Sequence, residues 1–190
     1  DNTTTGADSD QTGIGPVSNT AQLTVQEPPV LNKSFTPSVI QVGTISTLTF
    51  TLTNNNDTLV LMESWPHAFQ DFFPNGMTVA ATPNVTMTCS SGALRNDTND
   101  AAPVAGDIGV TFDSGFVPAN GSCTASVDVT VANPGSYVNT TTAAKTEYLG
   151  YIPAATATLT ATAGAPPSYD YGDAPTAGTA PSGTGSNNYG

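Results

Sequence analysis

The feature that most constrains the fold is a two-residue alternation of apolar and polar side chains. Between residues 47 and 53, Leu48, Phe50 and Leu52 alternate with threonines, and residues 122–132 show the same pattern. This period places one face of a strand in a core and the other toward solvent. Further short strands are expected over 58–63, 84–89, 107–112, 136–146 and 154–162, with turn residues between them and a polar loop over 90–106. The pattern predicts an antiparallel β-sandwich over residues 30–163.

The chain also nearly repeats itself. Asn-Thr-Thr-Thr occurs at 2–5 and at 139–142, Pro16 matches Pro153 at the same offset, and Pro28-Pro29 matches Pro166-Pro167 with one residue of slip. A large unit at a fixed period indicates tandem modules in a longer array. We therefore expect three parts. They are the end of a preceding repeat (1–29, a strand arm over 17–26 and a Pro linker), a complete repeat (30–163), and a Gly/Ser/Thr-rich tail that starts a following module (164–190).

The charge balance excludes several classes of partner. The chain has only three strong bases, against 15 acidic residues, and a net charge of −12. Such a chain cannot neutralise phosphates, which argues against nucleic acid and against an anionic membrane surface. No apolar run reaches the roughly 18 residues that a membrane-spanning helix needs, so no membrane insertion is expected. The acidic, Thr-rich composition favours an extracellular location.

The two cysteines are predicted to face the same core. Cys123 shares its parity with Ala125, Val127 and Val129, and Cys89 shares its parity with apolar neighbours in 84–89. A disulfide between Cys89 and Cys123 fits a secreted protein. The alternative is a pair of reduced core cysteines.

Residues 64–77 hold Trp65, His67, Phe69, Phe72 and Phe73. We expect the aromatic side chains to plug one end of the core. His67 is the only histidine, no second histidine can complete a metal site with it, and no nucleophile–base pair is evident. We therefore expect His67 to be a loop residue and the protein not to be an enzyme.

Several motifs resemble a known family. Lys33-Ser34-Phe35-Thr36-Pro37, the strand Leu48 to Asn54, Asp71-Phe72-Phe73-Pro74-Asn75-Gly76-Met77 and Pro134 to Thr140 resemble the tandem Ig-like conserved repeat of large bacterial surface and secreted proteins. Tyr169-Asp170-Tyr171-Gly172-Asp173-Ala174-Pro175 is similar to the start of a GEVED-type module. The resemblance implies an Ig-like sandwich in a cell-surface multidomain protein, and it implies no catalytic residues.

A lysine and an asparagine suggest a covalent cross-link. An intramolecular isopeptide bond needs a Lys amine, an Asn or Asp side chain and a carboxylic acid in a dry core. Lys33 lies in the first strand of the module and Asn139 near the last, and Asp71 or Glu63 could relay the proton. The alternative is a Lys33 that reaches solvent and an Asn139 that stabilises a turn.

Several loops hold clusters of side-chain oxygens that could bind calcium. Hard cations prefer carboxylate and carbonyl oxygens, but no loop here matches a complete calcium motif, so no cofactor is expected. Solvated turn carboxylates are the alternative. The weak candidate ligands are Asp8, Asp10, Asp97, Asp100, Asp170 and Asp173.

Seven asparagines occur in Asn-x-Ser/Thr sequences and are candidate glycosylation sites, although a Thr-rich chain produces such sequences by chance. They are Asn2, Asn32, Asn56, Asn84, Asn96, Asn120 and Asn139.

Together these features predict a structural unit of an extracellular bacterial fibre or stalk. An arm strand carrying Val17, Leu23 and Val25 needs a neighbour for its backbone and apolar groups. We expect it to pair with an adjacent chain and give self-association into a filament; packing on its own sandwich is the alternative. A second function would be an adhesin that binds a glycan or a host protein through its loops.

Overall fold

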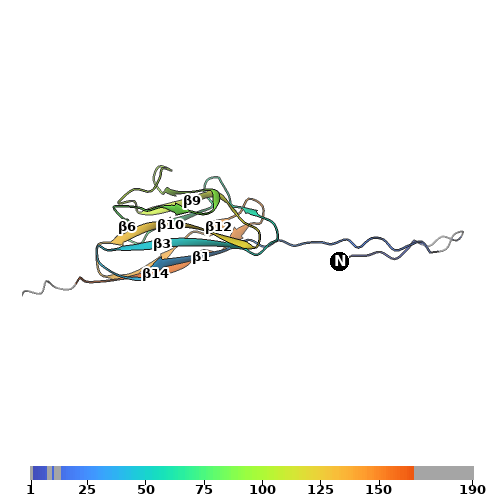
Figure 1. The fold of residues 1–190 in the computed structure, drawn as a ribbon, viewed down its shortest axis with the longest axis horizontal. Coiled ribbons are helices and arrows are strands. Elements are labelled where there is room, and N and C mark those ends of the chain that lie inside the picture. The colour runs from blue at the N-terminus through green and yellow to red at the C-terminus, as the bar shows by residue number, and fades with distance from the viewer. Residues whose placement is uncertain (1, 8–9, 11–13, 165–190) are drawn as a thin grey trace, which may run out of the picture.

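The computed structural model describes residues 2–7, 10 and 14–164, and those residues form fourteen β-strands and no helix (Figure 1). The strands are β1 (Val30–Thr36), β2 (Val39–Gln41), β3 (Ile45–Asn54), β4 (Val60–Leu61), β5 (Phe69–Phe72), β6 (Met77–Val79), β7 (Thr86–Met87), β8 (Ser90–Asn96), β9 (Gly109–Val117), β10 (Gly121–Val131), β11 (Gly135–Thr140), β12 (Ala144–Lys145), β13 (Tyr151–Ile152) and β14 (Thr156–Thr162). In this part of the chain, accordingly, no helix could span a bilayer.

The strands form a sandwich, which confirms the predicted fold class. One layer has the order β1-β3-β10-β6, with β7 also paired to β10. The other layer contains β9, flanked by β4, β5 and β8, and the sheet β11-β14-β2. The amides of Thr142 and Lys145 donate hydrogen bonds of 2.8 Å to the carbonyls of Gln70 and Ala68, which joins the segment after β11 to β5. All strand pairs are antiparallel except β14 with β2.

The core lies between the two layers and follows the predicted alternation. Leu48, Phe50 and Leu52 of β3 are all buried. Phe50 meets Phe69 of β5, and Phe69 stacks on Phe112 of β9, each at 5.1 Å between ring centroids. These ring contacts therefore join the two layers at β5, the strand that also carries Asp71.

Two local expectations are wrong. The polar segment expected as a loop over 90–106 begins with β8, whose pairing with β9 outweighs its weak strand propensity. The aromatic segment is not a plug: Phe69 and Phe73 are buried, but 82% of Trp65 and 54% of Phe72 are exposed. Strand parity explains Phe72, because it faces away from the core when Phe69 and Asp71 face inward.

The arm differs from the expectation as well. Residues 17–26 form no strand, and Ala21 makes only an isolated bridge with Asn2. Residues 2–7 lie beside 14–21 and extend away from the sandwich (Figure 1). A strand needs a neighbour to satisfy its backbone groups, and within this single chain only a short segment supplies one. The arm meets the sandwich through Glu27, whose amide and carbonyl both bond the Asn56 side chain.

Candidate functional site: a buried Lys–Asp–Asn cluster and a surface groove

Three strands direct polar side chains into the core. Lys33 lies between the inward-facing Leu31 and Phe35 of β1, Asp71 shares the inward face of β5 with Phe69, and Asn139 follows Tyr137 on the inward face of β11. The parity that buries the apolar residues therefore also buries these polar groups. β1 belongs to one layer, and β5 and β11 belong to the other.

The three side chains form one hydrogen-bonded cluster centred on Asp71. Lys33 Nζ donates to Asp71 Oδ1 at 2.6 Å, and Asn139 Nδ2 donates to Asp71 Oδ2 at 3.0 Å. The side chains of Lys33 and Asp71 are completely inaccessible to solvent, and Asn139 is 1% exposed. The structure therefore brings together the three residues that the sequence nominated, and it leaves Glu63 elsewhere, paired with Lys145 at 2.7 Å.

Burial controls the protonation of this pair. Desolvation lowers the pKa of Lys33 to about 8, although the attraction of Asp71 opposes that change. Desolvation likewise raises the pKa of Asp71, against the opposing effects of Lys33 and of the Asn139 hydrogen bond. Both changes favour a neutral amine beside a neutral carboxylic acid. A neutral amine is the nucleophilic form of lysine.

An unpartnered oxygen and a nearby aromatic ring describe the surroundings of the cluster. The Oδ1 atom of Asn139 is buried and has no hydrogen-bond partner, which is rare in a folded protein. Lys33 Nζ lies 5.5 Å from the centroid of the Phe50 ring, and Phe50 in turn contacts Phe69. The amine thus lies beside an aromatic ring, and all three side chains are shielded from water.

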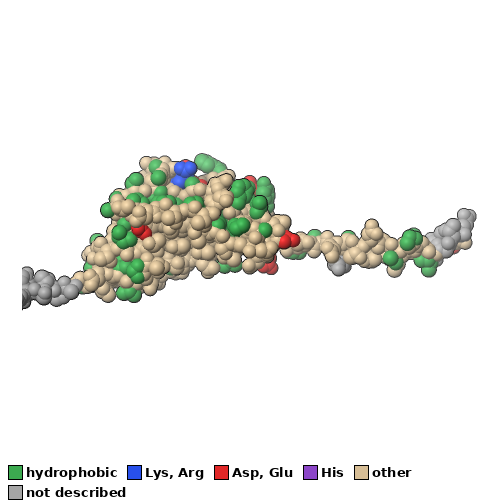
Figure 2. All heavy atoms as spheres, in the orientation of Figure 1, with side chains coloured by type: hydrophobic (Ala, Val, Ile, Leu, Met, Phe, Trp, Pro, Cys, Tyr) green, Lys and Arg blue, Asp and Glu red, His purple; other side chains and the backbone are tan. Residues whose placement is uncertain are grey.

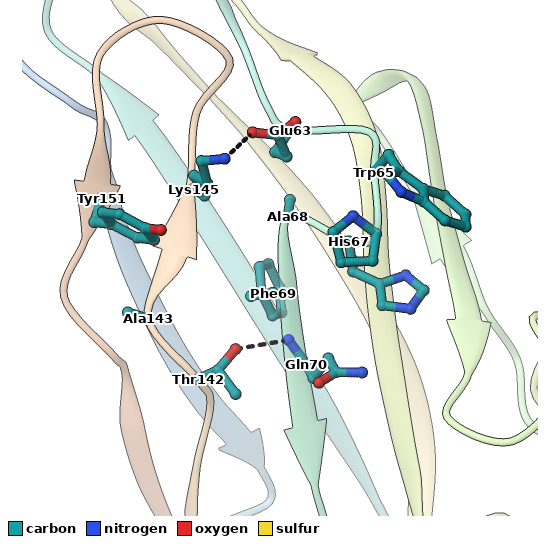
Figure 3. Close-up of a pocket in the computed structure, with 11 residues that line it drawn as sticks. Glu63, Trp65, His67, Ala68, Phe69, Gln70, Thr142, Ala143, Lys145 and Tyr151 are labelled. Carbon is teal, nitrogen blue, oxygen red and sulfur yellow. Dashed lines mark hydrogen bonds and ion pairs between the residues drawn. The ribbon is translucent and has the colours of Figure 1, made fainter.

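A groove of about 350 Å³ opens on the surface near the first residues of β5, Phe69 and Gln70 (Figure 3). Trp65 and Tyr151 stand on opposite sides of it and are largely exposed, at 82% and 69%. Polar groups lie between them, including the Lys145–Glu63 ion pair. Exposed aromatic faces beside hydrogen-bonding groups are suited to a ligand with both apolar and polar faces.

His67 is more constrained than the sequence indicated. Its Nδ1 lies 2.6 Å from Asp113 Oδ1, and Arg95 Nε lies 3.0 Å from Asp113 Oδ2 and 3.4 Å from Asp100 Oδ1. Desolvation raises the pKa of Asp113, and the His67 hydrogen bond opposes this. His67, Asp100 and Asp113 are close enough to bind a cation together, but the guanidinium of Arg95 already lies between the two carboxylates.

The other calcium candidates do not assemble into a site within the described residues. Asp10 lies in the exposed arm, and Asp97 and Asp100 lie in the turn after β8. The Asn96 side chain accepts the amides of Asn99 and Ala101 there, so that turn is closed by its own hydrogen bonds. Asp8, Asp170, Asp173 and the GEVED-like segment lie outside the described residues.

Cys89 and Cys123 are joined by a disulfide with a sulfur–sulfur distance of 2.11 Å, and both are buried. The bond ties the segment between β7 and β8 to β10, the strand with which β7 pairs.

Two of the glycosylation candidates are wrong. Asn96 is 5% exposed and Asn139 is 1% exposed, so neither side chain can carry a sugar in the folded protein. Strand parity turns both inward. The remaining described candidates are exposed or half-buried: Asn2, Asn32, Asn56, Asn84 and Asn120.

The arm's assembly residues stay in solvent. Val17 is 66% exposed, Leu23 is 87% exposed and Val25 is 77% exposed. Figure 2 shows hydrophobic side chains on the surface of the extended arm. The contacts within the arm parallel those of the complete module. In the arm, the Thr4 amide donates a hydrogen bond to Ser18 Oγ. In the module, the Thr141 amide donates to the Ala155 carbonyl. Thr141 and Ala155 are the positions that match Thr4 and Ser18 in the repeat.

A family model for a domain of unknown function, DUF7933, matches residues 29–161, which is most of the chain. The chain belongs to this family. The DUF7933 match includes all three residues of the buried cluster and both cysteines. No curated protein sequence shows a significant match to this chain.

Several solved structures are similar to part of this chain. The bacterial hydrophobin BslA covers 75% of this chain and 100% of its own length, with a TM-score of 0.44 and 14% identity. A cohesin module of a Clostridium perfringens glycoside hydrolase covers 73% of this chain and 99% of its own length, with a TM-score of 0.46 and 9% identity. A non-cellulosomal cohesin from Archaeoglobus fulgidus covers 73% of this chain and 92% of its own length, with a TM-score of 0.46 and 10% identity. Scores this low carry no argument about function.

Proposed function

We propose that this protein is a repeating structural unit of an extracellular bacterial fibre or stalk, and that units associate head to tail through the arm. The observation that carries the proposal is the arm itself. Among the described residues its backbone bonds the sandwich only through Glu27, and its apolar side chains stay in water. A second copy of this chain is the occupant we propose for the arm.

The position of the arm supports a chain of units. The arm leaves the sandwich at one end, and β14 finishes at the opposite end (Figure 1). A contact between the arm of one unit and the sandwich of the next is heterologous, so it repeats without closing into a ring unless its rotation happens to close. Pairing through the backbone also explains why the arm carries threonines and few charges.

An extracellular location is part of this proposal. A disulfide persists in an oxidising compartment and is rare in a reducing cytosol. The Cys89–Cys123 bond therefore supports a secreted or surface-exposed unit.

Deletion of residues 1–26 tests the proposal. We expect the truncated chain to keep its near-ultraviolet circular dichroism and melting temperature, and to lose the filaments that the full chain forms in electron micrographs. Filaments of the same kind from the truncated chain would contradict the proposal. A full chain that sediments as a compact monomer at high concentration would also contradict it.

A second function is carried by the groove between Trp65 and Tyr151. An adhesin that binds a glycan would use exposed aromatic rings to stack on sugar faces and neighbouring polar groups to bond hydroxyls. The groove offers both, with Lys145 and Glu63 beside the rings. Binding of soluble oligosaccharides, followed through the fluorescence of the single tryptophan, tests this function independently of assembly.

A further inference from the structure

We propose that Lys33 and Asn139 become joined by an intramolecular isopeptide bond, and that Asp71 is the catalytic residue that forms it. The inference rests on the contacts of the buried cluster and is independent of how the protein assembles. Its reactants are all supplied by this chain, and its only other product is ammonia.

The cluster holds the three groups that the reaction needs in one place. A primary amine, a carboxyl group and a carboxamide come from three different strands, and the carboxyl group contacts both of the others. None of the three side chains is accessible to bulk water. Contact among reacting groups in a fixed geometry replaces a slow bimolecular encounter with an intramolecular step.

Water exclusion favours bond formation over a stable ion pair. When two opposite charges are buried in a dry core, the hydration free energy that they lose exceeds their mutual attraction, unless further hydrogen bonds compensate the loss. Here Asp71 has one such bond, from Asn139, and the aromatic ring of Phe50 lies beside Lys33. Transfer of one proton from Nζ to Oδ1 across 2.6 Å removes both charges.

The unpartnered Oδ1 of Asn139 fits the neutral state of the pair. The oxygen and nitrogen of a side-chain amide are nearly equivalent in shape, so the amide can turn by half a rotation in the same space. An ionised Asp71 can only accept, and it then faces Nδ2. A protonated Asp71 can donate instead, and the turned amide would offer Oδ1 as its acceptor.

The bond changes follow in order. The lone pair of the neutral Lys33 Nζ attacks Cγ of Asn139 and forms the new N–C bond, while the carbonyl electrons move to Oδ1, which Asp71 stabilises with its proton. The tetrahedral intermediate then collapses, and the Cγ–Nδ2 bond breaks. Asp71 carries a proton from Nζ to Nδ2, which leaves as ammonia. Asp71 ends protonated, and nothing is oxidised or reduced.

The bond would join the two layers of the sandwich. Lys33 lies on β1, and Asn139 lies on β11, which is in the other layer. A pulling force applied at the two ends of the module would then pass through the cross-link, and the strands between β1 and β11 would be shielded from it. A unit of a fibre has a use for such a link, although the chemistry does not require a fibre.

Intact mass of the full chain is the first test. After reduction and denaturation, we expect a mass below that of the sequence by about 17 Da, the mass of one ammonia. Lys33→Met and Asn139→Ala should each restore the full sequence mass. The matched control is Lys145→Met, which removes the other lysine, a surface residue paired with Glu63, and should keep the deficit. A full sequence mass in the folded wild-type chain would overturn the proposal.

Cross-linked peptides from the wild-type chain give a second test that does not depend on whether variants fold. Proteolysis should yield one branched peptide that contains both Lys33 and Asn139. A branch between Lys33 and Asp71 would overturn the assignment, and it would also show a different deficit, of about 18 Da, because water leaves instead of ammonia.

Conservative substitutions separate a catalytic Asp71 from a merely structural one. Asn139→Asp should still form the bond, with loss of water, and give the same final mass as the linked wild-type chain. Asp71→Asn keeps the shape and the hydrogen-bonding capacity but cannot relay protons, so we expect it to fold and remain unlinked. A folded Asp71→Asn chain that carries the full deficit would overturn the role of Asp71.

Discussion

Lys33 and Asn139 donate hydrogen bonds to the two oxygens of one buried carboxylate, that of Asp71, although they lie on the first and the eleventh strands. This arrangement differs from an ordinary buried ion pair in having a reactive amide as its third member. Several measurements can distinguish the two interpretations without mass spectrometry.

Replacement of the ion pair by apolar residues should lower stability if the bond forms. Without a bond, Lys33→Met/Asp71→Leu exchanges a desolvated pair for packing, which is usually neutral or stabilising. With a bond, the exchange also removes a cross-link that closes a loop of roughly 100 residues, worth about 4–5 kcal/mol in the chain-entropy model. We expect the melting temperature to fall by about 8–20 °C. An unchanged or raised melting temperature would favour the ion pair.

An unlinked chain should become more stable in mild alkali. In Asp71→Asn, which is expected to remain unlinked, Lys33 stays buried without an acidic partner that could take its proton, and desolvation keeps its pKa below the 10.5 of the unfolded chain. Just below pH 10.5 the unfolded chain therefore binds a proton that the folded chain does not, so the free energy of unfolding rises as the pH approaches 10.5. Denaturant titrations of Asp71→Asn and of Lys33→Met/Asp71→Asn measure the rise. The rise must disappear in the double variant if Lys33 causes it.

Reduction of the disulfide should destabilise the sandwich. Cys89 and Cys123 are 34 residues apart, and a loop of that size is worth about 4 kcal/mol in the chain-entropy model. We expect urea to unfold the reduced chain at a lower concentration than the oxidised chain. Thiol labelling of the unfolded, unreduced chain should detect no free cysteine. Quantitative labelling would instead indicate two reduced core cysteines.

Polar substitutions in the arm should weaken assembly without affecting the sandwich. Leu23 and Val25 are 87% and 77% exposed and contribute little to the single chain. Leu23→Ser/Val25→Ser should therefore reduce filament formation at a given concentration and leave the melting temperature within about 1 °C. Val104→Ser, at an exposed apolar residue of the sandwich, is the matched control. Equal effects of both variants would count against a specific role for the arm.

The surface groove can be tested with the single tryptophan as a reporter. If oligosaccharides bind between Trp65 and Tyr151, they should change the emission of Trp65. Tyr151→Ala should weaken binding by roughly tenfold, because it removes one stacking face. Tyr148→Ala, at an exposed tyrosine that does not line this groove, should leave binding unchanged. No emission change with any tested sugar, or equal losses in the two variants, would argue against the adhesin function.

The sequence by itself determined the fold class and the inward-facing residues of the long strands. Alternation over β3 and β10 is enough to orient Leu48, Phe50, Cys123 and Val127, because successive side chains of a strand point to opposite faces. The same rule puts Lys33 on the face of Leu31 and Phe35, but the sequence left open whether its amine stays in the core or reaches solvent. Short strands were less predictable: β4 and β7 have two residues each, and β8 is held by its neighbour rather than by its own composition.

The tertiary structure alone decided which groups meet. The sequence left both Asp71 and Glu63 open as the acid, and only the packing of β5 against β1 and β11 places Asp71 between Lys33 and Asn139. Local patterns also could not show that Arg95 joins Asp113 and Asp100, or that Trp65 lies exposed beside a groove. Strand parity tells each side chain which face it occupies, but the contacts across a core depend on the register and order of strands that are distant in the chain.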